Sequence, residues 1–306
     1  MANRNIVVKK VAEFIGHQHP VYALIAAPEP GRFFSAGGDK TIVEWNLADP
    51  SVGLPIAQFQ FTIYCLCLIA DKNILLAGTS EGGIHVIGLN TKKEIKYFQL
   101  TGEGVFDIQF SLEHQLIVAS TSKGNLIFIN PDDFKLITTL NLSTEKIRSL
   151  AFNSTQPYLY AACSDTNVYV IDIKEKKKIF EFTAHNWACN ALVYNTEKDI
   201  LITASKDAHI RIWGIKREFE LIKNIPAHNY AIYQIAYNPA LNIYSTASRD
   251  KTIKLWDEEM DILLRINKED FEGHSNSVNS VIWLDEHHLV SGGDDRRVIL
   301  WEVSAS

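Results

Sequence analysis

Cysteine is scarce in this sequence of 306 residues, and its arrangement excludes two classes of protein. The four cysteines, Cys65, Cys67, Cys163 and Cys189, form no Cys-x-x-Cys pair and lie in apolar segments such as "IYCLCLIA" and "YAACS". Disulfide-rich secreted proteins and zinc sites use closely spaced or paired cysteines instead. We therefore expect four buried thiols in a reducing compartment that pack as small apolar side chains, with no disulfide framework and no cysteine-based zinc site.

Long runs of basic or apolar residues are also absent. The formal net charge is −6, and the only dense basic run, residues 174–178, has the length of a solvated turn. This charge balance argues against a nucleic-acid-binding protein. No apolar stretch approaches the roughly 18 residues of a membrane span. The N-terminal sequence lacks the apolar core and cleavage site of a signal peptide, so we expect a soluble, cytoplasmic protein without membrane association.

The apolar periodicity of helices is missing, which disfavours helical solenoids and doubly wound sheets. The sequence instead repeats at intervals of 42 to 45 residues. The repeat is seen in seven residues that each end a short alternating apolar run of strand type, such as "TIVEW", "HIRIW" or "TIKLW". These residues are Trp45, Ile87, Ile129, Ile171, Trp213, Trp256 and Trp301.

Each repeat contains four short alternating segments separated by turn residues, for example "KKIFEFTAH", "CNALVYN", "DILITAS" and "HIRIWGI" in the fifth. Four strands in about 40–45 residues are typical of one blade of a β-propeller. We therefore predict an all-β fold, a seven-bladed β-propeller of four-stranded antiparallel blades that forms one domain over residues 1–306. The predicted blades cover about residues 16–62, 63–104, 105–146, 147–188, 189–231, 232–277 and 278–306.

The two ends of the chain complement each other. Only Ser304, Ala305 and Ser306 follow the last run "VILWEV", so the seventh repeat lacks its outermost strand. A spare strand, about residues 5–15, precedes the first repeat. Pairing of these two segments would complete the last blade and close the ring without leaving an open sheet edge there.

Polar residues recur at fixed places in the repeats. The stretches "SAGGDKTIVEW" and "SGGDDRRVILW" both place a hydroxyl four residues before an aspartate and a tryptophan six residues after it. Two segments, "GHSNSVNSVIWLDEHHLVSGGDDRRVILWEV" and "AHNYAIYQIAYNPALNIYSTASRDKTIKLWDEE", resemble the WD-repeat family, whose units carry Gly-His, Ser/Thr, Asp and Trp-Asp at set offsets. The resemblance covers essentially the whole chain.

This resemblance implies that each complete unit contains a buried hydrogen-bonded tetrad that runs from indole to hydroxyl, histidine and aspartate. Carried over by position, the tetrads are His17-Ser35-Asp39-Trp45, His185-Thr203-Asp207-Trp213, His228-Thr246-Asp250-Trp256 and His274-Ser291-Asp295-Trp301. We interpret them as structural, so His228→Ala is predicted to lower the melting temperature. A hydrolase triad of Ser291, His274 and Asp295 is disfavoured, because a triad needs one exposed nucleophile and this constellation occurs four times.

Repeats two to four replace the tetrad as a set. The tryptophan positions become Ile87, Ile129 and Ile171, the hydroxyl positions become Ala77, Ala119 and Ala161, and the histidine positions become Phe59, Thr101 and Ser143. Complete replacement is expected, because one buried polar group left without its partner costs about 1–3 kcal/mol. Asp165 alone keeps its carboxylate, and we predict that it caps a tight turn through backbone N–H groups.

Two columns of residues are candidates for partner binding. Both belong to the top face, which we define as the loops that lead into the innermost strand of each blade and those that join its second and third strands. The family resemblance places the first column near the mouth of the central channel: Tyr22, Tyr64, Phe106, Arg148, Asn190, Tyr233 and Asn279. The second column precedes the turn aspartate: Gly38, Ser80, Ser122, Ser164, Lys206, Arg249 and Asp294.

Two interpretations of the first column remain open. Aromatic residues and arginine dominate the energetics of protein interfaces, so the column could bind a peptide or a protruding side chain. The alternative is that the aromatic rings only pack on one another. The charges give a weaker signal. Lys146, Arg148, Lys206 and Arg249 lie in repeats four to six, and Glu269, Asp270, Glu272 and Asp294 cluster near the junction of the last two, which suggests a top face with both signs of charge.

The function we predict is a non-catalytic scaffold or adaptor that binds a protein or peptide through the top face near the channel and is monomeric as a folded unit. Metal sites at His17 and His19 or at His287 and His288 are disfavoured, and no cofactor is expected. The alternatives are a propeller enzyme, either a hydrolase or an oxidoreductase, and a binder of small ligands in the central channel. The first column contains no His, Asp, Glu or Cys, which counts against the enzyme.

Overall fold

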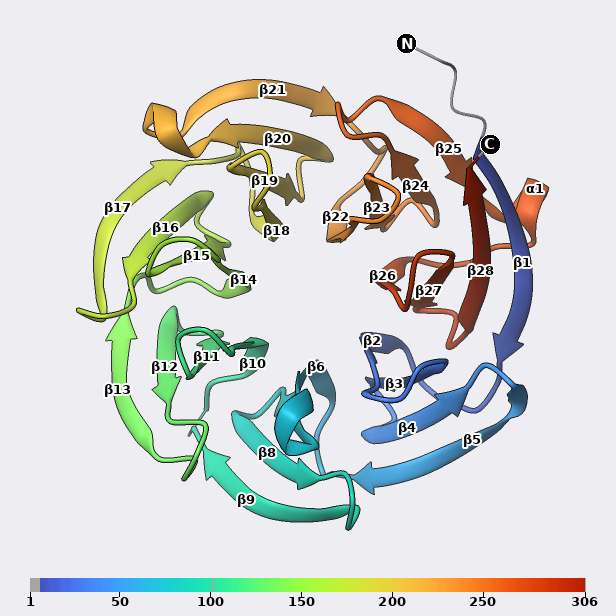
Figure 1. Cartoon of the computed structure of the whole chain (residues 1–306), viewed down its shortest axis with the longest axis horizontal. Coiled ribbons are helices and arrows are strands. Elements are labelled where there is room, and N and C mark those ends of the chain that lie inside the picture. The colour runs from blue at the N-terminus through green and yellow to red at the C-terminus, as the bar shows by residue number, and fades with distance from the viewer. Residues whose placement is uncertain (1–5, 101, 306) are drawn as a thin grey trace. The chain divides into compact units, whose positions relative to one another are not determined.

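Seven four-stranded antiparallel sheets make up the computed structural model, which describes residues 6–100 and 102–305. The sheets are the blades of a seven-bladed β-propeller, which confirms the predicted fold class (Figure 1). The chain divides into two compact units, the terminal unit of residues 1–63 and 233–306 and the central unit of residues 64–232. Each unit is described by itself.

The terminal unit contains three of the sheets. The first sheet consists of β2 (Val21–Ala26), β3 (Arg32–Gly37), β4 (Thr41–Asn46) and β5 (Asp49–Gln58). The sixth consists of β22 (Ile232–Asn238), β23 (Ile243–Ser248), β24 (Ile253–Trp256) and β25 (Ile262–Ile266). The seventh consists of β26 (Val278–Trp283), β27 (His288–Gly293), β28 (Val298–Ala305) and β1 (Ile6–Phe14).

The central unit contains the other four sheets. The second sheet consists of β6 (Ile63–Ile69), β7 (Ile74–Thr79), β8 (Gly83–Gly88) and β9 (Lys93–Gln99). The third consists of β10 (Val105–Ser111), β11 (Leu116–Thr121), β12 (Asn125–Ile129) and β13 (Leu136–Asn141). The fourth consists of β14 (Ile147–Phe152), β15 (Tyr158–Cys163), β16 (Asn167–Asp172) and β17 (Lys177–Thr183). The fifth consists of β18 (Cys189–Asn195), β19 (Ile200–Ser205), β20 (His209–Gly214) and β21 (Glu220–Pro226).

The chain ends pair as the sequence predicts. Strand β1 lies antiparallel to β28 from Ile6 opposite Ala305 to Phe14 opposite Val298, so it is the outermost strand of the seventh sheet. Glu13 of β1 also receives two hydrogen bonds from the guanidinium of Arg297, at 2.6 and 2.5 Å. The outer strand is therefore held both by its backbone ladder and by a charged pair.

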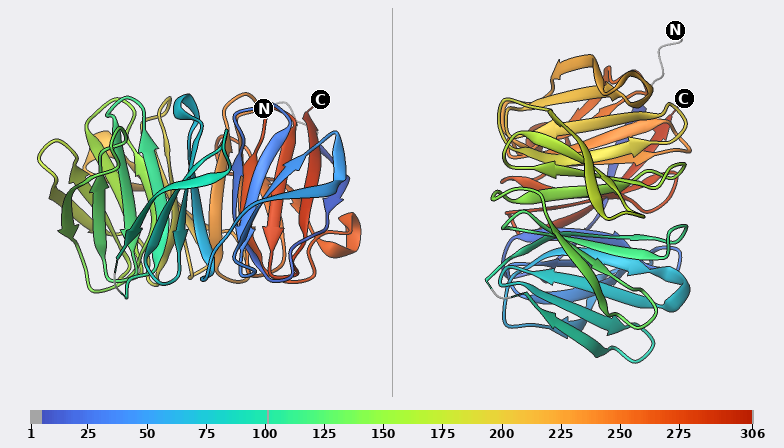
Figure 2. Two further views of the ribbon diagram at one scale, coloured as in Figure 1. Left: turned by 90° about the horizontal axis from the view of Figure 1, so that it is seen from below. Right: turned by 90° about the vertical axis from the view of Figure 1, so that its left-hand side faces the viewer.

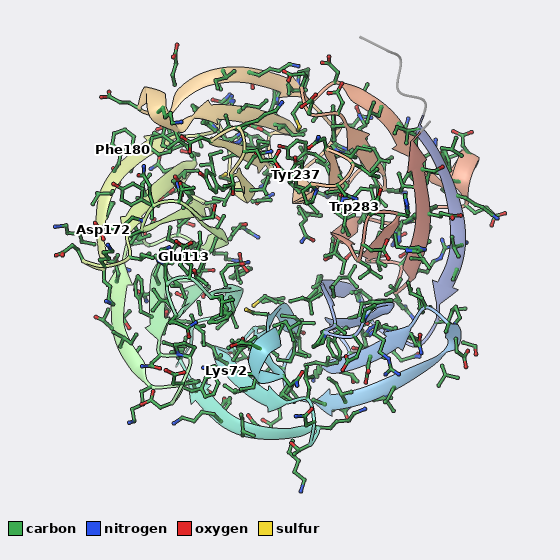
Figure 3. All side chains as sticks on the ribbon, in the orientation of Figure 1. Lys72, Glu113, Asp172, Phe180, Tyr237 and Trp283 are labelled. Atoms are coloured by element: carbon green, nitrogen blue, oxygen red, sulfur yellow. The ribbon has the colours of Figure 1, made fainter. Side chains whose placement is uncertain are left out.

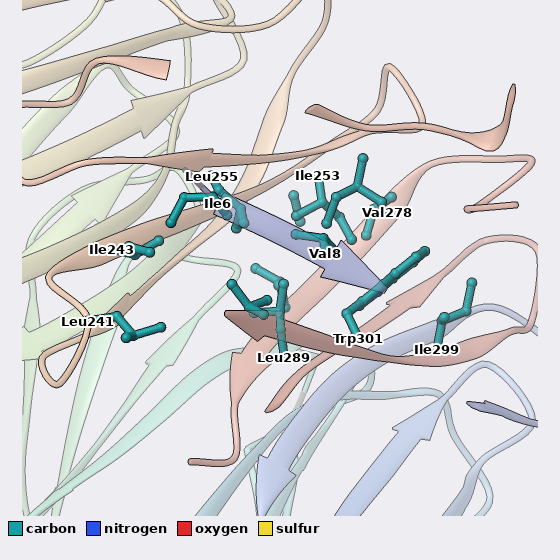
Figure 4. Close-up of a cluster of buried hydrophobic side chains, with 14 residues drawn as sticks. Ile6, Val8, Leu241, Ile243, Ile253, Leu255, Val278, Leu289, Ile299 and Trp301 are labelled. Carbon is teal, nitrogen blue, oxygen red and sulfur yellow. The ribbon is translucent and has the colours of Figure 1, made fainter. Parts of the chain in front are cut away.

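Apolar residues between neighbouring sheets form the cores. In the terminal unit one core joins the sixth and seventh sheets, where Ile243, Leu255, Leu289, Ile299 and Trp301 are buried (Figure 4). Each fully buried side chain of this kind is worth about 1.5–3 kcal/mol relative to exposure. The sheets of the terminal unit are therefore held face to face by apolar burial, and the hydrogen-bonded ladders set only the register within each sheet.

The cores of the central unit follow the same plan, with one aromatic addition. Phe182 and Phe219 stack with ring centroids 4.8 Å apart, and Phe180 stacks on Phe219 at 5.4 Å. Phe180, on the outermost strand β17, lies at the periphery of its sheet (Figure 3). The four cysteines are buried and reduced, as predicted, because each occupies a small apolar position in these cores.

Helical structure is limited to short turns among the described residues. The two 3-10 helices are η1 (Ala70–Lys72) and η2 (Ile215–Arg217), and the one α-helix is α1 (Lys268–Phe271). Asn267 is the N-cap of helix α1, and its side chain accepts a hydrogen bond from the backbone N–H of Asp270 at 2.8 Å. It lies outside the strands of the seventh sheet (Figures 1 and 2).

Candidate functional site

The tetrad of the seventh sheet is a continuous hydrogen-bonded chain. The indole N–H of Trp301 donates to Ser291 Oγ at 2.9 Å, and His274 Nε2 lies 2.9 Å from the same oxygen. His274 Nδ1 lies 2.8 Å from Asp295 Oδ1. Because the hydroxyl oxygen accepts from the indole, its own proton points to Nε2, and Nδ1 carries the proton that faces the carboxylate. Neutral imidazole therefore satisfies every member of the chain.

The complete geometry recurs in the first and fifth blades, and the sixth blade has the same bond from indole to hydroxyl. Trp45 Nε1 donates to Ser35 Oγ at 2.7 Å, Trp213 Nε1 to Thr203 Oγ1 at 2.9 Å, and Trp256 Nε1 to Thr246 Oγ1 at 2.9 Å. The histidine links are His17 to Ser35 at 2.6 Å, His17 to Asp39 at 2.7 Å, His185 to Thr203 at 2.9 Å and His185 to Asp207 at 3.2 Å. All of the hydroxyl groups are buried, which makes a nucleophilic role for them inaccessible.

Each tetrad carboxylate also organises the top loops. Asp295 Oδ2 accepts the backbone N–H of Ser275 at 2.8 Å, and Oδ1 accepts that of Arg297 at 3.3 Å. Burial raises the pKa of Asp295, but the hydrogen bonds from His274 and from the backbone N–H groups of Ser275 and Arg297 outweigh this effect and hold the pKa below its usual range. The ionised aspartate thus fastens the loop before the innermost strand to the turn between the second and third strands.

The turn between the second and third strands has a left-handed residue in every blade. Five of these residues directly follow an aspartate: Lys40, Thr166, Ala208, Lys251 and Arg296. In the two blades where Glu81 and Lys123 replace the aspartate, the left-handed residue is glycine, Gly82 or Gly124. An aspartate side chain that accepts the N–H two residues on offsets the strain of a positive φ, as Asp207 does for His209 at 3.0 Å. Without it, glycine is required.

The fourth blade, which lacks the tryptophan, retains a polar cluster. Asp165 Oδ1 accepts the N–H of Asn167 at 3.1 Å, so it caps the turn as predicted. Oδ2 of Asp165 additionally accepts the hydroxyls of Ser143 and Tyr169, both at 2.6 Å. Sequence reasoning missed Tyr169, whose only signal was a hydroxyl four residues after the aspartate. The histidine position at Thr101 lies outside the described residues.

In the central unit, the first column forms an aromatic and cationic cluster. The rings of Tyr64 and Phe106 stack with centroids 5.1 Å apart. Lys146 Nζ lies 5.4 Å and Arg148 Cζ 5.3 Å from the centroid of the Phe106 ring. Arg148 Nε donates to Ser164 Oγ at 2.9 Å, which joins the two predicted columns. Tyr64, Phe106 and Arg148 are half-buried, and Lys146 is exposed.

The two asparagines of the column make contacts within their units. Asn190 is nearly buried, and its side-chain N–H donates to the carbonyl of Ile232 at 2.9 Å. Asn279 donates to the carbonyl of Val21 at 3.0 Å and to Asp294 Oδ1 at 2.7 Å. Asn279 thereby connects the innermost strands of two neighbouring sheets of the terminal unit. Because the amide N–H groups of both asparagines are already hydrogen-bonded within the protein, the aromatic and cationic residues of the column are the stronger candidates for partner binding.

The other aromatic and cationic residues of the two columns are partly or fully accessible. In the terminal unit Tyr22 and Tyr233, near the start of β2 and β22, are half-buried. Lys206 in the central unit and Arg249 in the terminal unit are exposed in the turns between second and third strands. Lys206 Nζ lies 5.2 Å from the centroid of the Trp187 ring, a residue that the two columns did not include.

One carboxylate lies next to the first column. Asp107 Oδ2 accepts the backbone N–H of Leu150 at 2.7 Å, and Oδ1 accepts the side chain of Gln109 at 3.0 Å. Burial raises the pKa of Asp107 to about 6, because these hydrogen bonds offset only part of the loss of hydration. Its contacts connect the innermost strands of the third and fourth blades, which gives Asp107 a structural role.

Among the described residues, no group of three or more His, Cys, Asp or Glu side chains is placed to hold a metal ion. Burial raises the pKa of Cys67 to about 12, which removes the thiolate needed for a nucleophile. A cleft of 470 Å³ in the terminal unit is bordered by Asp39, Trp45 and Gly53. The Asp39 carboxylate is already hydrogen-bonded to His17 as part of the tetrad, so we assign it a structural role.

The family described as "WD domain, G-beta repeat" matches residues 8–46, 134–172, 176–214, 219–257 and 266–302, more than half of the chain. The chain belongs to this WD40 family, whose propellers are typically protein-interaction scaffolds. No significant match was found among curated proteins.

A solved structure has the same architecture. The crystal structure of the WD40 β-propeller domain of Doa1 superposes with a TM-score of 0.85 and covers 96% of this chain and 97% of that one. The sequence identity is 16%, so the likeness concerns the fold. Among the described residues, no helix is long and apolar enough to cross a membrane.

Proposed function

We propose that this protein is a non-catalytic scaffold that binds a protein or peptide partner through its top face. The observation that carries the proposal is the cluster of Tyr64, Phe106, Lys146 and Arg148 in the central unit. Aromatic rings and arginine are the residues most often found at the energetic centres of interfaces. The two rings and Arg148 are half-buried and Lys146 is exposed, so all four side chains are accessible to a partner.

The cluster is held in place before any partner arrives. Tyr64 supports one side of Phe106 by stacking, and Arg148 is oriented by its hydrogen bond to Ser164. Side chains that are already ordered lose little rotamer entropy on binding, which favours affinity. Tyr22, Tyr233, Arg249 and Lys206 occupy the other positions of the two columns, and we retain them as candidate contacts.

Affinity capture tests the proposal. The wild type is compared with a Tyr64→Ala/Phe106→Ala/Arg148→Glu variant and with a control, Leu136→Ala/Ile179→Ala/Lys174→Glu, whose exposed residues lie on outer strands and a turn. Circular dichroism first establishes that all three proteins fold. We expect partners that are lost only with the first variant, identified by mass spectrometry. Identical partner sets for wild type and that variant would refute a role of the cluster in binding.

A further inference from the structure

Two of the most exposed aromatic side chains of the central unit occupy equivalent loops. Trp187 is 57% exposed and Tyr230 is 59% exposed, and each lies two residues after a tetrad histidine. Burying a ring of this size would be favourable, so an aromatic ring exposed to this degree on an ordered loop marks a surface that gains from contact. The two rings and Lys206 are called the Trp187 surface below.

One turn holds this surface together. The turn at residues 205–208 joins β19 to β20 and carries Lys206. Its Ser205 hydroxyl donates to the carbonyl of Trp187 at 3.3 Å, and the N–H of Lys206 donates to the carbonyl of Ala188 at 2.9 Å. The carbonyl of Ala208 accepts the N–H groups of Ala227 and His228, at 3.0 and 3.1 Å. The loops of Trp187 and Tyr230 are therefore both fastened to the same four residues.

The tetrad of the fifth blade fixes the Trp187 loop further. Asp207 Oδ2 lies 3.2 Å from His185 Nδ1 and accepts the N–H of Asn186 at 3.2 Å. The residue before Trp187 is thus anchored to the buried core of the blade. A rigid loop presents its tryptophan at little entropic cost, which is how a strong binding residue is preorganised. The structural tetrad and the exposed ring are one connected assembly.

The charge of the surface selects the partner. The three segments that build it, residues 184–188, 205–208 and 226–231, contain one lysine and one acidic residue as their fully charged side chains. The acidic residue, Asp207, is committed to His185, Asn186 and the N–H of His209. Lys206 is exposed, and its ammonium lies over the Trp187 ring. The charges of Lys206 and Asp207 cancel in sum, but the Asp207 side chain is only 10% exposed and is hydrogen-bonded within the protein, so Lys206 is the charge that these segments present to a partner.

We infer that the Trp187 surface binds an acidic segment of a protein partner, with a carboxylate at Lys206 and an apolar side chain against Trp187 and Tyr230. This inference rests on the proposed function, since it assigns partner chemistry to a second part of the same face. A cationic segment is disfavoured because Lys206 already occupies the face of the indole. An anionic membrane is disfavoured because a single lysine gives only about 1 kcal/mol of surface attraction.

The test uses a displayed library of random twelve-residue peptides selected on the full-length wild-type protein at low salt. The selection is repeated with Lys206→Glu, with Trp187→Ala and with a charge-matched control, Lys174→Glu, whose lysine is exposed in a distant turn of the central unit. We expect enriched peptides with net negative charge and large apolar residues. Their affinity should fall by about tenfold or more with Lys206→Glu or Trp187→Ala, stay unchanged with the control, and weaken with added salt.

The inference is wrong if the selection enriches no peptides, or if it enriches neutral or basic peptides. It is also wrong if the selected peptides bind the wild type and Lys206→Glu with equal affinity. Co-sedimentation with phosphatidylserine vesicles that depends on Lys206 would reassign the surface to lipid. Melting temperatures of the exposed-site variants should match the wild type, which separates binding from folding. Because Tyr64, Phe106 and Arg148 are unchanged in these variants, failure here leaves the capture experiment on the cluster unaffected, and the reverse also holds.

Discussion

The hydroxyl of Tyr169 donates a 2.6 Å hydrogen bond to Oδ2 of Asp165, the same oxygen that accepts the hydroxyl of Ser143 at 2.6 Å. Two hydroxyls thus stand in for the histidine of a complete tetrad in a blade that has Ile171 in place of tryptophan. Burial and the hydrogen bond to Asp165 raise the pKa of Tyr169 to about 12. The turn carboxylate keeps its partners even where the indole is gone.

Replacing this phenol should weaken the fourth blade. We expect Tyr169→Phe to lower the free energy of unfolding by about 1.5 kcal/mol, the usual value of a hydrogen bond to a charged group. Urea unfolding followed by circular dichroism measures the change. Tyr97→Phe, at an exposed tyrosine of the second blade, serves as the control and should change stability little. Equal stability of wild type and Tyr169→Phe would show that Ser143 and Asn167 suffice for Asp165.

Much of the fold could be predicted because its determinants are local and repeated. Alternating runs such as "TIVEW" and the turn residues between them specify short strands, and the period counts the blades. The pairing of β1 with β28 followed from one strand missing at the end and one spare at the start. These features depend on residue type and order, which a sequence displays directly.

The details of the candidate site depend on distances that a sequence does not display. Tyr169 reaches Asp165 from the next strand, and Asn279 reaches the carbonyl of Val21, which is 258 residues away in the sequence. The exposure of Trp187 arises because its loop is tied by its backbone and leaves the ring outside. In each case the residue type allowed several roles, and the cross-strand geometry selected one.

Removal of a tetrad histidine should be costly. His274→Ala leaves Asp295 and Ser291 without their shared partner in a buried place. Each orphaned group costs about 1–3 kcal/mol, so we expect the free energy of unfolding to fall by about 3 kcal/mol. Urea unfolding gives this value, with His287→Ala at an exposed histidine as the control. An unchanged midpoint for His274→Ala would contradict the structural role of the tetrads.

The tetrad of the fifth blade predicts a pH dependence. Burial lowers the pKa of His185 below its usual value, although Asp207 partly opposes this. The unfolded chain then binds more protons near pH 6 than the folded protein, so stability rises with pH in this range. We expect the free energy of unfolding to fall as pH drops below about 6.5, the ordinary histidine pKa. It should fall again below about pH 4, where the aspartate of the unfolded chain takes up a proton while the depressed pKa of Asp207 keeps the folded carboxylate ionised.

Urea unfolding at pH 7, 6 and 5 measures the first step. His185→Gln should be less stable at pH 7 but should show a smaller loss between pH 7 and pH 5 than the wild type. His287→Gln, at an exposed site, should keep the wild-type pH profile. If His185→Gln and the wild type lose stability equally over this range, His185 is not held neutral by the fold.

The effect of exchanging glycine and alanine at the left-handed turn position should depend on whether an aspartate precedes it. A Cβ on Gly124 would approach the carbonyl oxygen of Ser143 to 2.0 Å, and its φ is +73° with no preceding aspartate. Gly124→Ala should therefore destabilise the protein by more than about 1 kcal/mol. Ala208→Gly, in a turn held by Asp207, should change the free energy of unfolding by less than this, since the backbone is already supported by the side chain. Equal changes in the free energy of unfolding for the two variants would show that the aspartate does not compensate for the strain of the positive φ.

The pair of Glu13 and Arg297 should govern how firmly the N-terminal strand closes the seventh sheet. Arg297 also donates to the carbonyl of Gly273 at 2.7 Å, so Glu13→Gln keeps the arginine in place and removes only the charge partner on β1. We expect about 1.5 kcal/mol less local stability and about tenfold faster hydrogen exchange of the β1 amides, with β22–β24 unchanged.

The contribution of the Glu13–Arg297 pair to stability should depend on pH. The hydrogen bond from Arg297 lowers the pKa of Glu13, so the pair contributes fully at neutral pH and loses its contribution as the pH falls below the ordinary glutamate pKa of about 4.3. The difference between wild type and Glu13→Gln should therefore shrink as the pH falls below about 4.3, and a difference that stays constant between pH 7 and pH 3 would mean that the pair does not act through its charge.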